Sequence, residues 1–103
     1  MSFHLVAEAQ EEVDQASQWL DDRQFGLGDR FLAELENAYK IIQRDPTAIP
    51  EYEIPRIPRG IRRQPLQSFP YIVVFGSFAA DEIIVFAVAH TARMPGYWRD
   101  RLN

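Results

Sequence analysis

The sequence predicts an α+β domain with the element order β-α-α-β-β-β, in which a helical hairpin packs on one face of a mostly antiparallel four-stranded sheet. Three observations predict this architecture. Two segments in the first half repeat apolar residues every three or four positions, three segments in the second half are rich in β-branched and aromatic residues, and a proline-rich stretch separates the groups. The chain has 103 residues, 47% of them hydrophobic, so we expect residues 1–103 to form a single domain.

A short strand is expected at Phe3–Val6, and the first helix follows it. This helix is indicated by apolar residues that recur on one face, at Ala9, Val13, Ala16 and Leu20. We expect it to end near Gln24–Gly26, where Gly26 and Gly28 can adopt the positive φ values that reverse the chain.

A second helix is expected from Gly28 to Arg44, because a single apolar stripe continues through Leu27, Phe31, Leu35, Ala38 and Ile42. Pro46 ends it, since proline disfavours helical backbone in the residue before it. The short connection between the two helices predicts an antiparallel hairpin. Four prolines between residues 46 and 58 then predict an ordered loop without regular structure.

Three strands are expected next, at Gly60–Leu66, Tyr71–Gly76 and Glu82–His90, with a turn at residues 77–81 between the last two. They should pair as an antiparallel meander. Pro65 cannot donate to a strand ladder, which places the first of the three at a sheet edge or a bulge. The tail from Met94 to Asn103 allows at most a short helix.

Two of the expected strands are apolar on both faces. Strict alternation in the last strand separates Ile84, Phe86, Val88 and His90 from Ile83, Val85, Ala87 and Ala89, and the strand before it separates Tyr71, Val73 and Phe75 from Ile72 and Val74. Such strands are normally covered on both faces, and the hairpin can cover only one. We therefore expect the second face to be largely open for another polypeptide. The alternative is that Tyr97, Trp98 and Leu102 of the tail fold back and cover it.

The charge is distributed unevenly along the chain. The net charge is −4, but residues 1–53 hold 12 acidic and 4 basic side chains, whereas residues 54–103 hold 3 acidic and 7 basic ones. Every basic residue of the second half is an arginine: Arg56, Arg59, Arg62, Arg63, Arg93, Arg99 and Arg101. Arginine binds phosphates and carboxylates bidentately, so an acidic partner is one interpretation and a solubilising surface is the other.

Composition excludes several classes of function. The chain has no cysteine, which removes disulfides, thiolate metal sites and a cysteine nucleophile. Its two histidines are far apart, so no metal site is expected, and no motif calls for a cofactor. No apolar run approaches the roughly 20 residues of a membrane span, and the N-terminus lacks the features of a secretory signal. We expect a cytoplasmic protein that does not bind membranes.

Four segments resemble, in order and spacing, the ParE/RelE superfamily of bacterial type II toxins. They are Gly-Leu-Gly-Asp-Arg-Phe-Leu at 26–32, Gly-Ile-Arg-Arg at 60–63, Phe-Pro-Tyr at 69–71 and Ala-Val-Ala-His-Thr-Ala-Arg-Met-Pro-Gly-Tyr-Trp at 87–98. The resemblance covers nearly the whole chain. It implies a RelE/ParE-like fold and a toxin that acts in plasmid stabilisation or in the stress response. The resemblance also implies that a cognate, ParD-like antitoxin neutralises the toxin with a disordered tail that folds onto it. The antitoxin, and not this chain, would then bind DNA sequence-specifically.

The expected partner-binding surface combines the second sheet face with the arginines and the tail. Its candidate residues are Ile72, Val74, Ile83, Val85, Ala87, Arg62, Arg93, Tyr97 and Trp98.

The resemblance leaves two active functions open. A ParE-like protein inhibits DNA gyrase and performs no chemistry, whereas a RelE-like protein cleaves mRNA on the ribosome. Cleavage needs a base, an acid and cations for the phosphate. Arg62, Arg63 and Arg93 could bind the phosphate, and the resemblance implies that His90 and Tyr97 lie where superfamily nucleases place C-terminal catalytic side chains. A net charge of −4 disfavours docking on ribosomal RNA, so we favour gyrase as the target. A non-toxic interaction module of the same fold is a third hypothesis.

Each candidate also has a structural interpretation. His90 can be a partly buried histidine that is hydrogen-bonded to backbone. Arg62 and Arg63 point to opposite faces of their strand, so one of them is expected to pair with a helix carboxylate such as Glu34 or Glu36. Tyr97 and Trp98 can anchor the tail to the domain.

Overall fold

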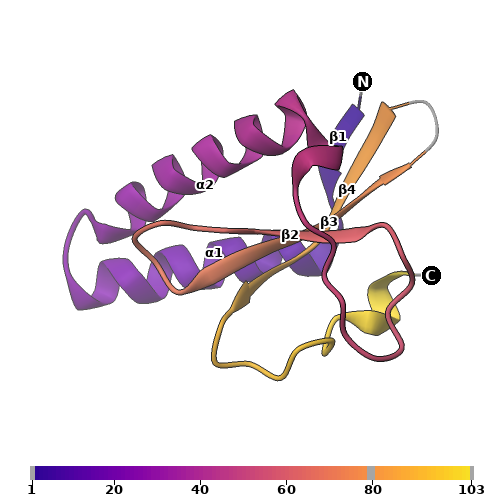
Figure 1. Ribbon diagram of the computed structural model, residues 1–103. Coiled ribbons are helices and arrows are strands. Elements are labelled where there is room, and N and C mark those ends of the chain that lie inside the picture. The colour runs from indigo at the N-terminus through magenta and orange to yellow at the C-terminus, as the bar shows by residue number, and fades with distance from the viewer. Residues whose placement is uncertain (1, 79–80, 103) are drawn as a thin grey trace.

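The computed structural model describes residues 2–78 and 81–102 and contains one sheet and two long helices (Figure 1). The elements follow the order β1 (Ser2–Leu5), α1 (Ala7–Arg23), α2 (Leu27–Arg44), β2 (Ile61–Pro65), β3 (Tyr71–Phe78) and β4 (Glu82–His90), with short 3-10 helices at Pro46–Ala48 and Arg99–Leu102. The strand order in the sheet is β1-β4-β3-β2. Only β1 runs parallel to its neighbour, β4, so the α+β fold expected from the sequence is confirmed.

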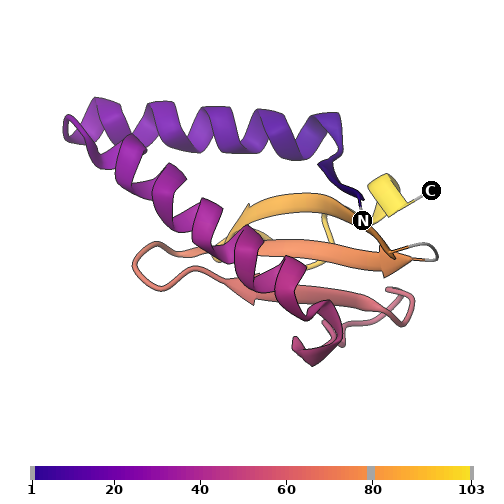
Figure 2. The same ribbon diagram turned by 90° about the horizontal axis from the view of Figure 1, so that it is seen from above.

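The helical hairpin projects beyond the sheet at the turn between its helices (Figures 1 and 2). Each helix buries the predicted stripe: Ala9, Val13, Ala16 and Leu20 in α1, and Phe31, Leu35, Ala38 and Ile42 in α2. Gly26 has φ +87° and reverses the chain, as predicted. The prediction for Gly28 is wrong. Gly28 lies inside α2, and it is required there because a Cβ atom would stand 2.5 Å from the Ser17 carbonyl oxygen of α1.

Strand β2 lies at the sheet edge, which is one of the two positions, edge or bulge, that the proline at its end predicted. The loop before it is ordered by a bridge between Glu51 and Arg62 and by backbone hydrogen bonds from the Tyr52 N–H to Ile61 and from the Arg63 N–H to Pro50. The expected turn between β3 and β4 includes Ala79 and Ala80, which lie outside the described residues.

A β-bulge in β4 changes the expected orientation of its side chains. Val74 pairs with Ala87, but the next residue of β3, Phe75, pairs with Val85, so Phe86 is an extra residue. The alternation therefore shifts by one at this point. Before the bulge Ile83 and Val85 face the helices, and after it Val88 faces them while Phe86, Ala87 and Ala89 face the opposite side. The strict alternation expected along β4 is wrong for this reason.

Both faces of the sheet are covered by the chain itself. The helix-side core joins α1 and α2 to Val73, Phe75, Ile83, Val85 and Val88. The second core contains Ile61, Ile72, Val74, Phe86, Ala87, Ala89 and Trp98, with Tyr52, Ile54, Ile57, Tyr97 and Leu102 packed against it. The expectation of a largely open second face is thus wrong, because the proline-rich loop and the tail fold over it together.

Candidate functional site

A single carboxylate, that of Glu12, connects α1, β4 and the C-terminal tail. One of its oxygens accepts hydrogen bonds from the Val88 backbone N–H at 3.0 Å and from Arg101 at 2.9 Å. The other accepts one from the Tyr97 hydroxyl and one from Arg101 at 3.2 Å, and Arg93 approaches it at 3.5 Å. The Glu12 side chain is only 12% exposed and that of Arg101 17%, so this pair is largely shielded from water, whereas Arg93 is 55% exposed.

Sheet topology explains why β4 needs this carboxylate. Strand β1 pairs with β4 only as far as Val85, and from Phe86 onward that edge of β4 has no neighbouring strand among the described residues. Arg101 donates to the Phe86 carbonyl at 3.0 Å, and Glu12 accepts from the Val88 N–H. Two side chains therefore satisfy backbone groups at a strand edge that would otherwise be costly to bury.

Two residues of this cluster, Arg93 just before the tail and Tyr97 within it, are stacked on each other. The Arg93 guanidinium lies 3.6 Å from the centroid of the Tyr97 ring, a cation–π contact. Burial, followed by the hydrogen bond to Glu12 and its charge, raises the pKa of the Tyr97 hydroxyl above its usual value. Burial lowers the pKa of Arg101, but the hydrogen bond and charge of Glu12 outweigh it, so the net shift is upward.

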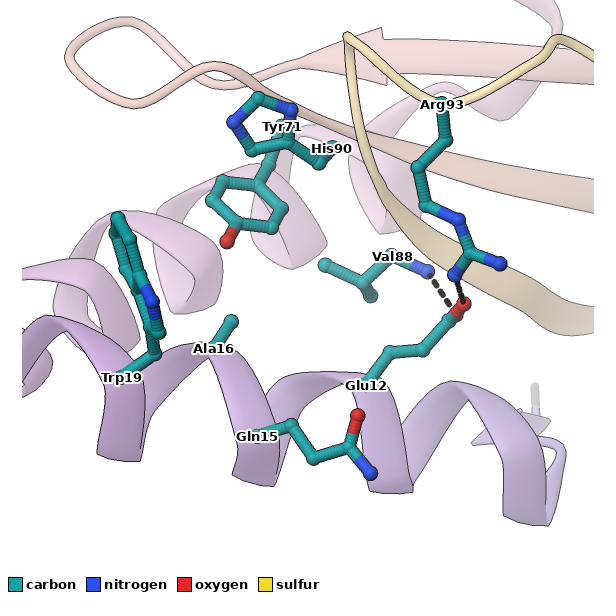
Figure 3. A pocket seen from close by; sticks show the side chains of 8 residues that line it. All are labelled: Glu12, Gln15, Ala16, Trp19, Tyr71, Val88, His90 and Arg93. Carbon is teal, nitrogen blue, oxygen red and sulfur yellow. Dashed lines mark hydrogen bonds and ion pairs between the residues drawn. The ribbon is translucent and has the colours of Figure 1, made fainter.

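A groove of about 310 Å³ opens beside this cluster, between α1 and the adjoining ends of β3 and β4 (Figure 3). We call it the α1 groove. Its lining residues are Glu12, Gln15, Ala16, Trp19, Tyr71, Val88, His90 and Arg93. Trp19 forms one wall and is 51% exposed, which leaves much of a large apolar ring in contact with water.

A second, smaller hollow of about 190 Å³ lies on the tail side of the sheet. Four of the five residues considered for a nuclease line it: Arg63, His90, Arg93 and Tyr97. The fifth, Arg62, points elsewhere and donates to the carbonyl oxygens of Thr47 at 3.3 Å and Ile49 at 2.5 Å. The fold therefore gathers most of the predicted set, but it uses Arg62 to hold the loop after α2.

The geometry of the gathered residues is not that of a prepared acid–base site. The His90 Nδ1 accepts a hydrogen bond from the Ala92 backbone N–H at 3.0 Å, which leaves the proton of the neutral ring on Nε2. Tyr97 donates to Glu12, and its raised pKa keeps the hydroxyl protonated. The structural interpretation of His90 as a histidine bonded to backbone is therefore confirmed.

The expected ion pair between an arginine of β2 and a helix carboxylate is wrong. Arg62 and Arg63 do point to opposite faces, but Arg63 lies over the Tyr52 ring at 4.7 Å. Glu34 instead accepts a hydrogen bond from the Ser68 backbone N–H at 2.6 Å.

The apolar residues expected to bind a partner are buried in the folded chain. Ile83 and Val85 face the helices because they precede the bulge in β4. Ile72, Val74 and Ala87 lie under the tail and the proline-rich loop, and Trp98 is the tail residue buried against them. Of the expected set, Arg93 and Tyr97 line a groove or hollow without being buried, Ile72 and Trp98 line the smaller hollow as buried residues, and Arg62 is bound to the loop.

Sequence reasoning missed Glu12, Gln15, Trp19 and Arg101. Glu12 was one of several acidic residues in the first turns of a helix, and nothing local separates it from its exposed neighbour Glu11. The position of Trp19 could have indicated a binding residue. Trp19 lies outside the buried stripe of α1, and its large apolar ring is therefore exposed at the surface.

Neither helix in the described part of the chain is long and apolar enough to cross a membrane. Across residues 2–78 and 81–102, no three acidic or histidine side chains gather as a metal site would require.

The sequence matches no protein-family model, and no curated protein matches it either. Among solved structures, the chain is similar to one described as a chromosomal ParDE TA system from P. aeruginosa. That match has a TM-score of 0.71 at 16% sequence identity and covers 87% of this chain and 95% of the other. Together with the α+β topology, this likeness confirms the ParE/RelE-like fold that the four sequence segments implied.

Proposed function

We propose that this chain is the toxin of a type II toxin–antitoxin system, that it acts by binding DNA gyrase as ParE-like proteins do, and that a ParD-like antitoxin neutralises it. The toxin–antitoxin part is supported by the likeness of nearly the whole fold to a chain of a ParDE TA system. It is supported independently by the four segments of sequence that resemble the superfamily.

The choice of gyrase over RNA cleavage is carried by the state of the Glu12 cluster. The Tyr97 hydroxyl donates to Glu12, and the Nδ1 of His90 is occupied by a backbone N–H. A nuclease needs one group free to take the 2′-hydroxyl proton and another free to protonate the leaving oxygen. The net charge of −4 also works against an enzyme that must dock on ribosomal RNA.

One observation favours the second candidate, a ribosome-dependent endoribonuclease. Arg63, His90, Arg93 and Tyr97 line one hollow, and hydrogen bonds in a free enzyme can rearrange when substrate binds. This function requires Tyr97 or His90 to exchange its present partner for the substrate.

The test is expression in a bacterium that lacks an antitoxin, followed by two parallel assays of purified protein. Growth arrest is expected, together with linear plasmid trapped when gyrase and supercoiled plasmid are present. Fragments of mRNA cut on translating ribosomes, with no trapped plasmid, would overturn gyrase as the target and favour the nuclease function. Normal growth at confirmed levels of folded protein would overturn the toxin proposal and favour a non-toxic module.

A further inference from the structure

The α1 groove combines a half-exposed aromatic wall with the exposed charge of Arg93, and a second cation, Arg23, lies 4.1 Å from the centroid of the Trp19 ring. Trp19 lines it from α1 and Tyr71 from β3, and Figure 3 shows both rings bordering the space above Ala16. Trp19 is 51% exposed although it borders a concave surface. A partner's apolar side chain placed here would remove the indole from water, which is the usual source of affinity at a groove.

Arg93 supplies the accessible charge of the groove. Its side chain is 55% exposed, and its contact with Glu12, at 3.5 Å, is longer than both hydrogen bonds from Arg101. Because Arg101 already makes the shorter contacts with Glu12, the more exposed Arg93 guanidinium, which lies 3.6 Å from the centroid of the Tyr97 ring, can also receive a partner's carboxylate. The Glu12 charge is shielded by comparison, at 12% exposure.

We infer that the α1 groove binds a short segment of a partner protein that places an apolar side chain against Trp19 and a carboxylate on Arg93. The identification of that segment with the antitoxin rests on the proposed function, but the binding itself does not. A single-stranded nucleic acid also offers a stacking group and an anion. It fits less well, because the net charge of −4 opposes an extended polyphosphate, whereas a single carboxylate needs only one cation.

The chain contains its own reporter for this binding. It has two tryptophans, of which Trp98 is 1% exposed and Trp19 is 51% exposed. Quenching of fluorescence by acrylamide therefore reports on Trp19. The probe is a capped hexapeptide of glycine and serine with one leucine beside one glutamate. Two further probes are the same peptide with lysine in place of glutamate, and a hexanucleotide of uridine.

We expect the glutamate peptide to protect Trp19 from quenching and the lysine peptide to bind about tenfold more weakly. Arg93→Gln should weaken binding of the glutamate peptide by a similar factor. Arg99→Gln removes an exposed arginine outside the groove and should leave that binding unchanged. Gln15→Glu adds a negative charge inside the groove and should weaken binding of the glutamate peptide about threefold. Its matched control, Gln18→Glu, places the same charge at an exposed position outside the lining and should leave binding of the peptide unchanged.

Three results would overturn the inference. They are no protection of Trp19 by the glutamate peptide, equal protection by the lysine peptide, and protection by the hexanucleotide alone. None of them depends on toxicity, so growth arrest without peptide binding would leave the proposed function standing and remove only this inference. Peptide binding without growth arrest would do the opposite.

Discussion

Glu12 and Arg101 lie 89 positions apart in the sequence, yet the Arg101 guanidinium donates hydrogen bonds at 2.9 and 3.2 Å to the two carboxylate oxygens of Glu12. The side chains are 12% and 17% exposed. This pair joins the first helix to the last turn of the chain and thereby holds the tail over the second core. Removing one partner of such a pair destabilises the folded state strongly, because the other partner is left charged and shielded from water.

Glu12→Gln is therefore expected to destabilise the protein by about 3 kcal/mol, because the isosteric amide leaves Arg101 without its counter-charge. Urea unfolding measures this change. Glu11→Gln is the matched control on the exposed face of the same helix turn and should shift the free energy of unfolding by less than about 0.5 kcal/mol. Equal effects of the two substitutions would contradict the central role of Glu12.

Trp98→Ala should cost about 3 to 5 kcal/mol, because the ring is 1% exposed and its removal opens a cavity between the tail and the sheet. The loss should also appear locally, as faster amide exchange in Arg99–Leu102. Met94→Ala, at a largely exposed position of the same tail, is expected to change neither quantity. Slow exchange of the tail in the Trp98 variant would show that other contacts hold it.

Gly28→Ala is expected to destabilise the hairpin by about 1 to 3 kcal/mol, since the new methyl group would overlap the Ser17 carbonyl oxygen. The sign of the change in the free energy of unfolding identifies the clash, because a glycine-to-alanine change inside a helix is otherwise stabilising by up to about 1 kcal/mol. Ala33→Gly, at an exposed position of α2, gives the ordinary propensity effect for comparison. A stabilised Gly28 variant would mean that the helices can separate at little cost.

The stability of the protein should fall as the pH rises above 10, in part through Tyr97. Its pKa is raised from 10.0 in the folded state, by burial first and then by Glu12, so the folded protein holds the hydroxyl proton after the unfolded chain has released it. The contribution is fully present below pH 10 and is lost as the pH rises through the folded-state pKa.

Tyr97→Phe removes this titration and should therefore give a shallower loss of stability above about pH 10 than the wild type shows. Burial also raises the pKa of Tyr71, and burial together with Glu36 raises that of Tyr39, but both residues remain in the two proteins being compared. Urea unfolding at a series of pH values measures the difference. Parallel curves for the two proteins would contradict a protonated Tyr97 hydroxyl as the source.

The elements themselves could be predicted because their signals are local. The spacing of Val13 and Leu20 indicates a helix face from any short window of sequence, and Pro65 indicates an edge strand by lacking a donor. The candidate site could be predicted only in part. Arg93 was identified because an arginine can bind a phosphate, and Tyr97 through the superfamily resemblance. Glu12 and Trp19 became prominent only when α1 was seen beside β4.

By itself, the sequence determined the two amphipathic helices and the antiparallel order of the last three strands, and it limited β2 to a sheet edge or a bulge, because periodicity and backbone chemistry act over a few residues. Only the tertiary structure decided which side each residue of β4 faces, since one bulge at Phe86 reverses the alternation after it. It also decided that the tail and the proline-rich loop cover the second face. Both outcomes depend on pairings between distant segments, which no local pattern encodes.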